Sequence, residues 1–176
     1  MKQLFINTSL ILFISVLTMG GCLEKLTSIN FDYTTEATLS VEAIEAPGEY
    51  VIGESVLTSS LKQELEKNNT SLDLLDELTL RSAKVTITDS TLNFNSIEKI
   101  ELYIAADGNP EVLIASKNPV LDDQNNLTLT VNSNENLANY IKATTFTYRV
   151  KGVSSGPIPA MDLKADVIWT IKASAK

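Results

Sequence analysis

Few residues in this chain could carry chemistry. Its 176 residues include no histidine and a single cysteine, Cys22. The lack of histidine excludes Ser-His-Asp and Cys-His catalytic arrangements, His-ligated zinc sites and the usual general base near neutral pH. Carboxylates, lysines and hydroxyl groups remain. We therefore expect a protein that is not an enzyme, and we assign it no catalytic, cofactor-binding or metal-binding residue.

The Cys22 thiol follows a segment with the order of a secretory signal. Residues 1–21 carry one charge, on Lys2, followed by an apolar run over residues 10–17 and by Gly20 and Gly21 directly before the cysteine. The run is well short of the roughly 20 apolar residues that a membrane-spanning helix needs. We expect residues 1–21 to direct export and then to be removed.

The four residues Met19-Gly20-Gly21-Cys22 resemble the processing site of the bacterial lipoprotein family. This resemblance implies that the Cys22 thiol accepts a diacylglyceryl group, that the peptide is cut before Cys22 and that the new amine is acylated. Because Leu23 rather than Asp follows the cysteine, it also implies attachment to the outer membrane, facing either the periplasm or the cell surface. In the alternative interpretation, Cys22 is an ordinary buried thiol behind a plain signal peptide.

The charge balance fits attachment through lipid. Loss of residues 1–21 removes only Lys2 among the charged residues, which leaves 13 Lys and Arg against 22 Asp and Glu, a net charge of −9. Such a surface repels phosphate backbones and anionic headgroups, so we expect no nucleic-acid partner. Each buried acyl CH₂ contributes about 0.8 kcal/mol to membrane binding. With Cys22 acylated no disulfide can form, and the core must hold the domain together.

Carboxylates could still serve a glycoside hydrolase, which needs two of them around a sugar and keeps one protonated in an apolar pocket. The acidic candidates fall on the polar faces of predicted strands or in turns: Glu42, Glu45, Glu101, Asp162 and Asp166. These positions favour solvated surface charge over catalysis.

Two polar segments offer oxygen ligands for calcium, Asp107-Gly108-Asn109 and residues 122–126. They lack the spacing of an EF-hand loop and are equally typical of polar turns. The glycines of residues 152–156 match neither a dinucleotide fingerprint nor a phosphate-binding loop. We predict a flexible loop from Gly152 to Pro159.

Aromatic side chains could form a platform for sugar rings, but strand alternation turns most of them inward. The residues predicted on the core side are Phe31, Tyr33, Phe146, Tyr148 and Trp169. Tyr103 alone is predicted to point outward. A sugar-binding face is therefore an alternative with one candidate residue.

Period-two alternation of apolar and polar residues predicts strands along most of the chain after Cys22. The last of them, residues 161–171, is the cleanest. Between residues 54 and 67, Leu57, Leu61 and Leu65 recur every four residues, which predicts one amphipathic helix. A short helix is predicted near residues 135–141, and a bulge near Ser82 where the alternation slips.

Seven or eight strands with short connections and no βαβ alternation predict a mainly β protein. We expect an antiparallel two-sheet sandwich, immunoglobulin-like or related, with one amphipathic helix; a small β-barrel is the alternative. In this interpretation residues 22–28 form a lipidated tether and residues 29–176 a single β-sandwich domain.

The sequence thus predicts an envelope lipoprotein that acts as a non-enzymatic binding or assembly module. Cys22 is its lipidation site and the membrane its first partner, while a protein partner would meet sheet edges or loops. The alternatives are a carbohydrate-binding accessory protein and a carboxylate-based glycoside hydrolase. Neither a specific ligand nor a cofactor is predicted.

Overall fold

The computed structural model describes residues 28–120, 124–132 and 134–175. Cys22, the tether before Ser28, and Asp122 and Asp123 of the second calcium candidate lie outside the described residues. The elements, in chain order, are β1 (Ser28–Val41), β2 (Gly48–Thr58), α1 (Leu61–Lys67), a 3₁₀ turn (Leu72–Leu74), β3 (Leu75–Ile87), β4 (Ile97–Ala106), β5 (Asn109–Lys117), β6 (Asn126–Val131), α2 (Ala138–Ile141), β7 (Thr145–Ser154) and β8 (Met161–Ser174).

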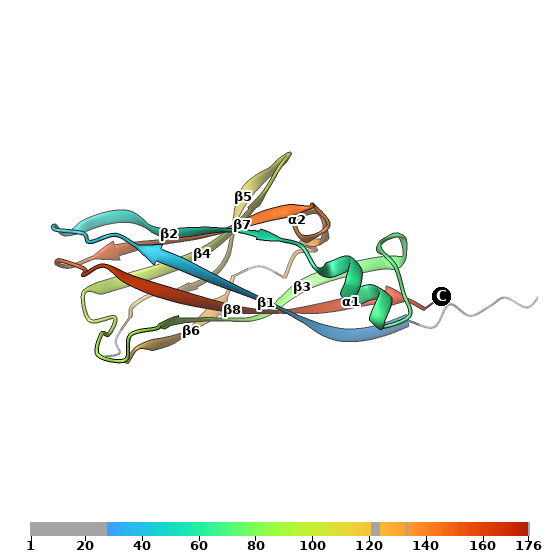
Figure 1. Ribbon diagram of the computed structural model, residues 1–176, viewed down its shortest axis with the longest axis horizontal. Coiled ribbons are helices and arrows are strands. Elements are labelled where there is room, and N and C mark those ends of the chain that lie inside the picture. Colours follow the sequence, from blue (N-terminus) through green and yellow to red (C-terminus); the bar gives the residue numbers. More distant parts are fainter. Residues whose placement is uncertain (1–27, 121–123, 133, 176) are drawn as a thin grey trace, which may run out of the picture.

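The eight strands form one curled antiparallel sheet in the order β1-β8-β3-β6-β5-β4-β7-β2. β6 joins its two halves: residues 126–129 pair with β3, and Thr130 and Val131 pair with β5. The halves β1-β8-β3-β6 and β5-β4-β7-β2 lie over one another as two layers (Figure 1). The predicted mainly β, antiparallel, sandwich-like fold is confirmed, and the link through β6 makes it half of a barrel.

The core fills the space between the layers and follows the predicted phases. Alternate residues of β8 from Met161 to Ala173 are all buried, as are Phe146, Tyr148 and Val150 on β7. The register of β3 against β8 shifts between Leu80 and Ser82, where the bulge was predicted. Burial of these side chains is the main stabilising term for such a domain.

The amphipathic helix is shorter than predicted. Residues 54–58 belong to β2 and pair with residues 145–149 of β7, so the predicted helix start was wrong. Val56 and Thr58 are β-branched and suit a strand better than a helix, and a leucine at every fourth position is compatible with either structure. Only Leu61 and Leu65 remain on α1, and both are buried.

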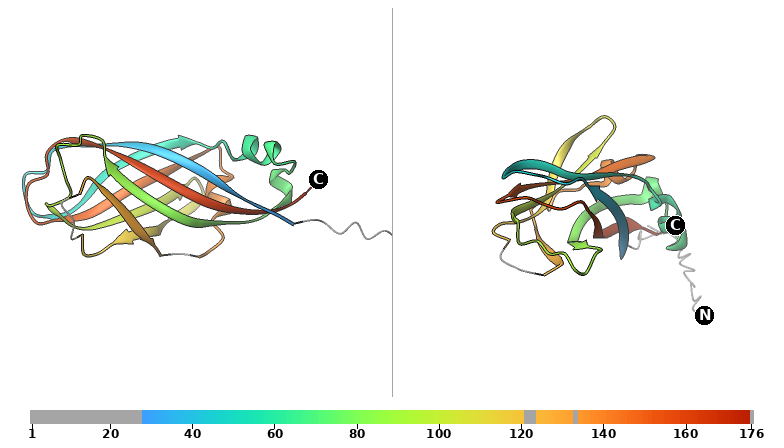
Figure 2. Two further views of the ribbon diagram at one scale, coloured as in Figure 1. Left: turned by 90° about the horizontal axis from the view of Figure 1, so that it is seen from below. Right: turned by 60° about the vertical axis from the view of Figure 1, so that its left-hand side comes forward.

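The helix α1 lies at one end of the curled sheet. Figure 2 shows it at the end of the elongated molecule where β1 begins and β8 ends. The Tyr33 hydroxyl lies 3.0 Å from the Ser60 hydroxyl just before α1, and the Thr70 hydroxyl donates a hydrogen bond to the Ser174 carbonyl (2.6 Å). Within the described residues, no helix is long and apolar enough to span a membrane.

The predicted loop from Gly152 to Pro159 was wrong at its start. β7 continues to Ser154 because its last residues pair with both β2 and β4. Gly152 serves close packing here: a Cβ atom at this position would lie 2.7 Å from the Lys99 carbonyl oxygen and would overlap the Ile52 side chain. The sequence shows a glycine at this position, but the close approach of Ile52 and of the Lys99 carbonyl could not be predicted from it.

Candidate functional site

The outward-facing side chains of β2, β7, β4 and β5 form a connected polar surface, here called the polar face. Its charged and aromatic members are Glu49, Glu54, Lys99, Glu101, Tyr103, Glu111, Arg149 and Lys151. They share the outer side of one half of the sheet because strand residues two apart point the same way. Their inward neighbours, such as Leu102 and Val150, belong to the core.

Glu101 organises one end of the polar face. Its carboxylate lies 2.7 Å from the Lys99 ammonium and accepts a hydrogen bond from the Tyr103 hydroxyl (3.2 Å). The hydrogen bond to Glu101 raises the pKa of Lys99, while burial and then the Glu101 charge raise the pKa of Tyr103. The Lys151 ammonium lies 4.2 Å from the centre of the Tyr103 ring, a cation–π contact.

Arg149 links three strands at the other end of the polar face. Its guanidinium donates to Glu54 on β2 (3.1 and 2.9 Å) and to Glu111 on β5 (2.6 Å), reaching across β4. Glu111 also accepts a hydrogen bond from Lys151. Burial alone would raise the pKa of Glu111, but hydrogen bonds from Lys151 and Arg149, with their charges, outweigh it and lower the pKa. The hydrogen bond to Glu54 raises the pKa of Arg149.

A shallow hollow of about 350 Å³ lies in the polar face beside this network. Its polar walls are Glu49, Lys99, Glu101 and Lys151, and Tyr103, Val51 and Val153 provide apolar surface. Val51 is 55% exposed, one of two large hydrophobic side chains that stand out to solvent in the described chain. A volume of this size is at the lower end for small-molecule sites.

A second hollow of about 430 Å³ adjoins the first at the edge of the sheet. It runs from Ser40, near the end of β1, and Ile44, just after β1, to Gly53 on β2, and it shares Tyr50 and Val51 with the first hollow. The Tyr50 hydroxyl donates to the Ala46 carbonyl (3.0 Å). The two hollows thus adjoin one another at Tyr50 and Val51 of β2.

β7, which runs beneath the first hollow, has no free hydrogen-bonding edge. It pairs with β2 on one side and with β4 on the other along the residues that line the hollow. A ligand over β7 must therefore be held by side chains, because added strand pairing is open only at the outer edge of β2.

The structure separates the acidic residues that the sequence singled out. Glu101 lies in the polar face, as just described. Glu42 and Glu45 are exposed after β1, while Asp162 and Asp166 lie on β8 in the opposite half of the sheet. Asp162 accepts a hydrogen bond from Ser40 (2.8 Å), and Asp166 is 2.8 Å from Lys164. The five carboxylates thus do not form one site.

Tyr103 points outward as predicted, and Tyr33, Phe146, Tyr148 and Trp169 are buried as predicted. Phe31, also predicted inward, is partly buried against the core. The sequence reasoning missed Arg149, Lys151 and Glu111, although alternation does place the two basic residues outward. Their mutual contacts depend on strand order, which the alternation does not report.

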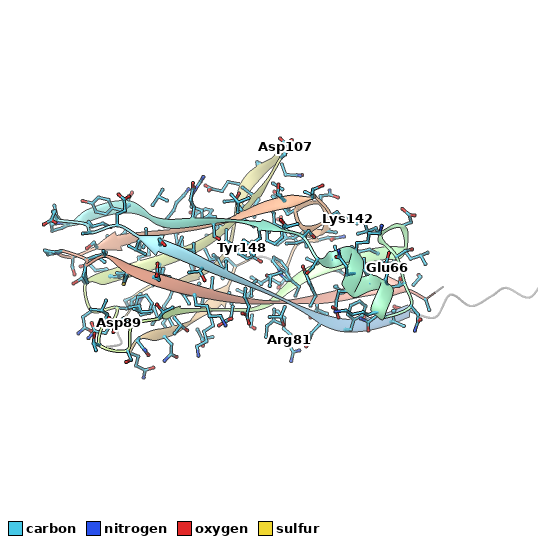
Figure 3. The ribbon with its side chains drawn as sticks, in the orientation of Figure 1. Glu66, Arg81, Asp89, Asp107, Lys142 and Tyr148 are labelled. Carbon is cyan, nitrogen blue, oxygen red and sulfur yellow. The ribbon has the colours of Figure 1, made fainter. Side chains whose placement is uncertain are left out.

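The calcium candidates gain no support from the described residues. Asp107 and Asn109 lie at the tip of the β4–β5 hairpin, which projects from the body with Asp107 at its end (Figure 3). Across the described residues, no group of three or more acidic, cysteine or histidine side chains could hold a metal ion.

No protein-family model matches the chain, and no curated protein matches it. A solved structure from work on the promiscuous specificity of carbohydrate-binding modules of the β-sandwich superfamily aligns with 12% identity and a TM-score of 0.31. The alignment covers 84% of this chain and 56% of that one, so this chain spans little more than half its length. A likeness this distant has no bearing on function.

Proposed function

We propose that the chain is an exported lipoprotein, anchored to the outer membrane by lipid on Cys22, and that its β domain is a non-enzymatic binding module. The signal-like residues 1–21 and the lone cysteine support the anchor. The polar face with its hollow supports the binding role and is the observation that carries it. Its charged side chains hold one another in place, which prepares the surface for a ligand at low entropic cost.

The state of the carboxylates favours binding over hydrolysis. A glycoside hydrolase needs a carboxyl group that stays protonated near neutral pH. On the polar face, Glu101 is paired with Lys99, and Glu54 and Glu111 are paired with Arg149. The pKa of Glu111 is lowered, which is the opposite of what a general acid requires.

The strand order limits where another protein could add a strand to this sheet. β1 and β2 are the two ends of the strand order and each pairs with a single strand, so protein strands could add only there. The hollow lies mainly over paired strands and suits a ligand that side chains can hold. We propose that this ligand is a fixed component of the cell envelope.

Detergent extraction of envelopes from the native host tests the binding role. A protein held only by its lipid dissolves with the membrane, whereas one that also binds an insoluble envelope component stays in the pellet. We expect the wild-type chain to be retained and the Tyr103→Ala/Lys151→Ala double variant to be released. Lys164→Ala is the matched control, because Lys164 also pairs with two carboxylates, Glu36 and Asp166, but on the opposite half of the sheet.

Complete release of the wild-type chain by mild detergent would overturn the binding role. Equal retention of all three proteins would show that the polar face is not the surface that binds.

A further inference from the structure

We propose that the hollow in the polar face binds an uncharged oligosaccharide. This inference rests on the proposed binding role and names its ligand class. The donors and acceptors around the hollow, its balanced charge and the adjoining second hollow support this ligand class.

The polar groups around the hollow include both hydrogen-bond donors and hydrogen-bond acceptors. The ammonium groups of Lys99 and Lys151 can only donate, whereas the carboxylates of Glu49 and Glu101 can only accept. A hydroxyl group can accept from a lysine and donate to a glutamate at once. Neighbouring hydroxyls on a sugar ring therefore match this lining better than a ligand group that can only donate or only accept hydrogen bonds.

The charges in the hollow select against ions. A carboxylate or phosphate would meet Glu49 and Glu101, and an ammonium ligand would meet Lys99 and Lys151. Glu101 and Lys99 already neutralise one another at 2.7 Å. Two glutamates and two lysines line the hollow, so its formal charges balance and neither an acidic nor a basic sugar meets an excess of opposite charge.

Apolar surface lies beside these polar groups. The Tyr103 ring, Val51 and Val153 line the same hollow. The C–H groups on the faces of a pyranose ring can pack against such a surface while the hydroxyls reach the charged groups. A ligand that is apolar on its faces and polar around its rim fits both parts of the lining.

The second hollow indicates a chain of sugars rather than a single unit. It shares Tyr50 and Val51 with the first and continues past Gly53 toward β1. A ligand lying in both hollows crosses β2 and reaches the end of the sheet. Binding should therefore strengthen as the oligosaccharide grows beyond one unit.

The test uses isothermal titration of the purified full chain in detergent. The neutral probes are oligomers of glucose, mannose and N-acetylglucosamine, from one unit to about six units, and the acidic probe is an oligomer of galacturonic acid. We expect at least one neutral series to bind, with the longest member about tenfold or more tighter than the monosaccharide. Tyr103→Ala and Glu101→Gln should each weaken that binding about tenfold, whereas Lys164→Ala should leave it within about twofold.

Amide NMR shifts of the wild-type chain give a readout that does not depend on how the variants fold. We expect the bound oligosaccharide to shift amides of Val51, Tyr103 and Lys151, and not those around Lys164. Binding by the acidic oligomer alone, binding by no neutral series, or shifts confined to other surfaces would each overturn the inference.

The outcomes also separate this inference from the function on which it rests. If the chain stays in the detergent-resistant pellet through its polar face but binds no neutral oligosaccharide, the ligand class is wrong and the binding role stands. If the wild-type chain is released from the pellet and no probe binds, both are wrong.

Discussion

The indole N–H of Trp169 points at the hydroxyl oxygen of Tyr148, 3.2 Å away, in the interior of the molecule. Trp169 lies on β8 in one half of the sheet and Tyr148 on β7 in the other, with Tyr148 between the layers in Figure 3. The Thr35 hydroxyl on β1 completes the group, 2.6 Å from the Tyr148 oxygen and 3.2 Å from the indole nitrogen. Hydrogen bonds thus join the two halves across the core.

Removing one hydroxyl from this group should destabilise the fold. Thr35→Val or Tyr148→Phe removes two of the three hydrogen bonds in this buried group, which costs about 1–3 kcal/mol of unfolding free energy. Thr34→Val, at the exposed neighbouring position, is the control and should change stability by less than about 0.5 kcal/mol. Trp169 is the only tryptophan and is fully buried, so its fluorescence reports unfolding in urea. Equal stability of Thr35→Val and Thr34→Val would contradict the role given to this group.

Truncation of the tryptophan itself should cost more. Trp169→Ala removes the largest fully buried side chain and leaves a cavity, with an expected loss of about 3–5 kcal/mol. Thermal melting followed by circular dichroism measures it, because the fluorescent reporter is gone. An unchanged melting curve would mean that this side chain is not in the core.

A methyl group at Gly152 should strain the packing of β7. Gly152→Ala would bring Cβ to 2.7 Å from the Lys99 carbonyl and into the Ile52 side chain, so we expect a loss of about 1–3 kcal/mol. Gly156→Ala is the control, since its Cβ would meet nothing within 4 Å. Ile52→Ala removes the overlapping side chain but costs about 2–5 kcal/mol by itself, because Ile52 is buried. Gly152→Ala should still destabilise the Ile52→Ala protein, because the Lys99 carbonyl belongs to the paired backbone of β4. Urea unfolding curves of the wild type, the three single variants and the double variant test this, and no effect of Gly152→Ala in the Ile52→Ala protein would exclude the carbonyl contact.

Glu111 should make the domain lose stability in acid. Its pKa in the folded state is lower than the ordinary value of 4.5, so folding favours the ionised form. The resulting stabilisation is fully present above that ordinary value and is lost as the pH falls through the lower, folded pKa. Glu111→Gln should therefore reduce stability at about pH 6 and flatten the decline between about pH 6 and about pH 3. A decline as steep in Glu111→Gln as in the wild type would contradict this assignment.

Detection of lipid on Cys22 is the most direct test of the proposed membrane anchoring. Cells fed an alkyne analogue of palmitate should label the wild-type chain, and the intact mass should equal residues 22–176 plus acyl groups. Cys22→Ala should abolish the label and leave the chain uncut at this site. Label on the Cys22→Ala chain, or an unmodified wild-type mass, would show that Cys22 is not the lipidation site.

Sequence patterns predicted the strands well because alternation is a local property. β8 and β7 show it most clearly, and their inward residues are all buried. Residues 54–58 were misassigned because a leucine every four residues satisfies a helix, while the partner that makes them a strand, β7, lies some ninety residues further along the chain. Which half of the sheet carries each strand could not be predicted, because nothing local records the order in which strands pair.

The candidate site shows the same limit. Tyr103 and Glu101 were placed outward from alternation alone, and that placement is correct. The ion pairs of Glu111 with Arg149 and Lys151 could not be foreseen, because they join β5 to β7 across β4. Charged residues on the outward side are typical of any solvent-exposed strand. Only the strand order shows that Glu111 lies close enough to Arg149 and Lys151 to form ion pairs.

The pairing of β1 with β8 has a consequence for when the protein can fold. All fourteen residues of β1, from Ser28 to Val41, pair with residues 161–174, so this ladder closes a loop of more than a hundred residues. A growing or emerging chain has no partner for β1 until Met161 and the residues after it are available, and such non-local pairing is intrinsically slow. A chain stopped before Met161 is therefore expected to remain sensitive to protease. The core is therefore completed only when the last strand is available, which is compatible with the proposed export of the chain before it folds.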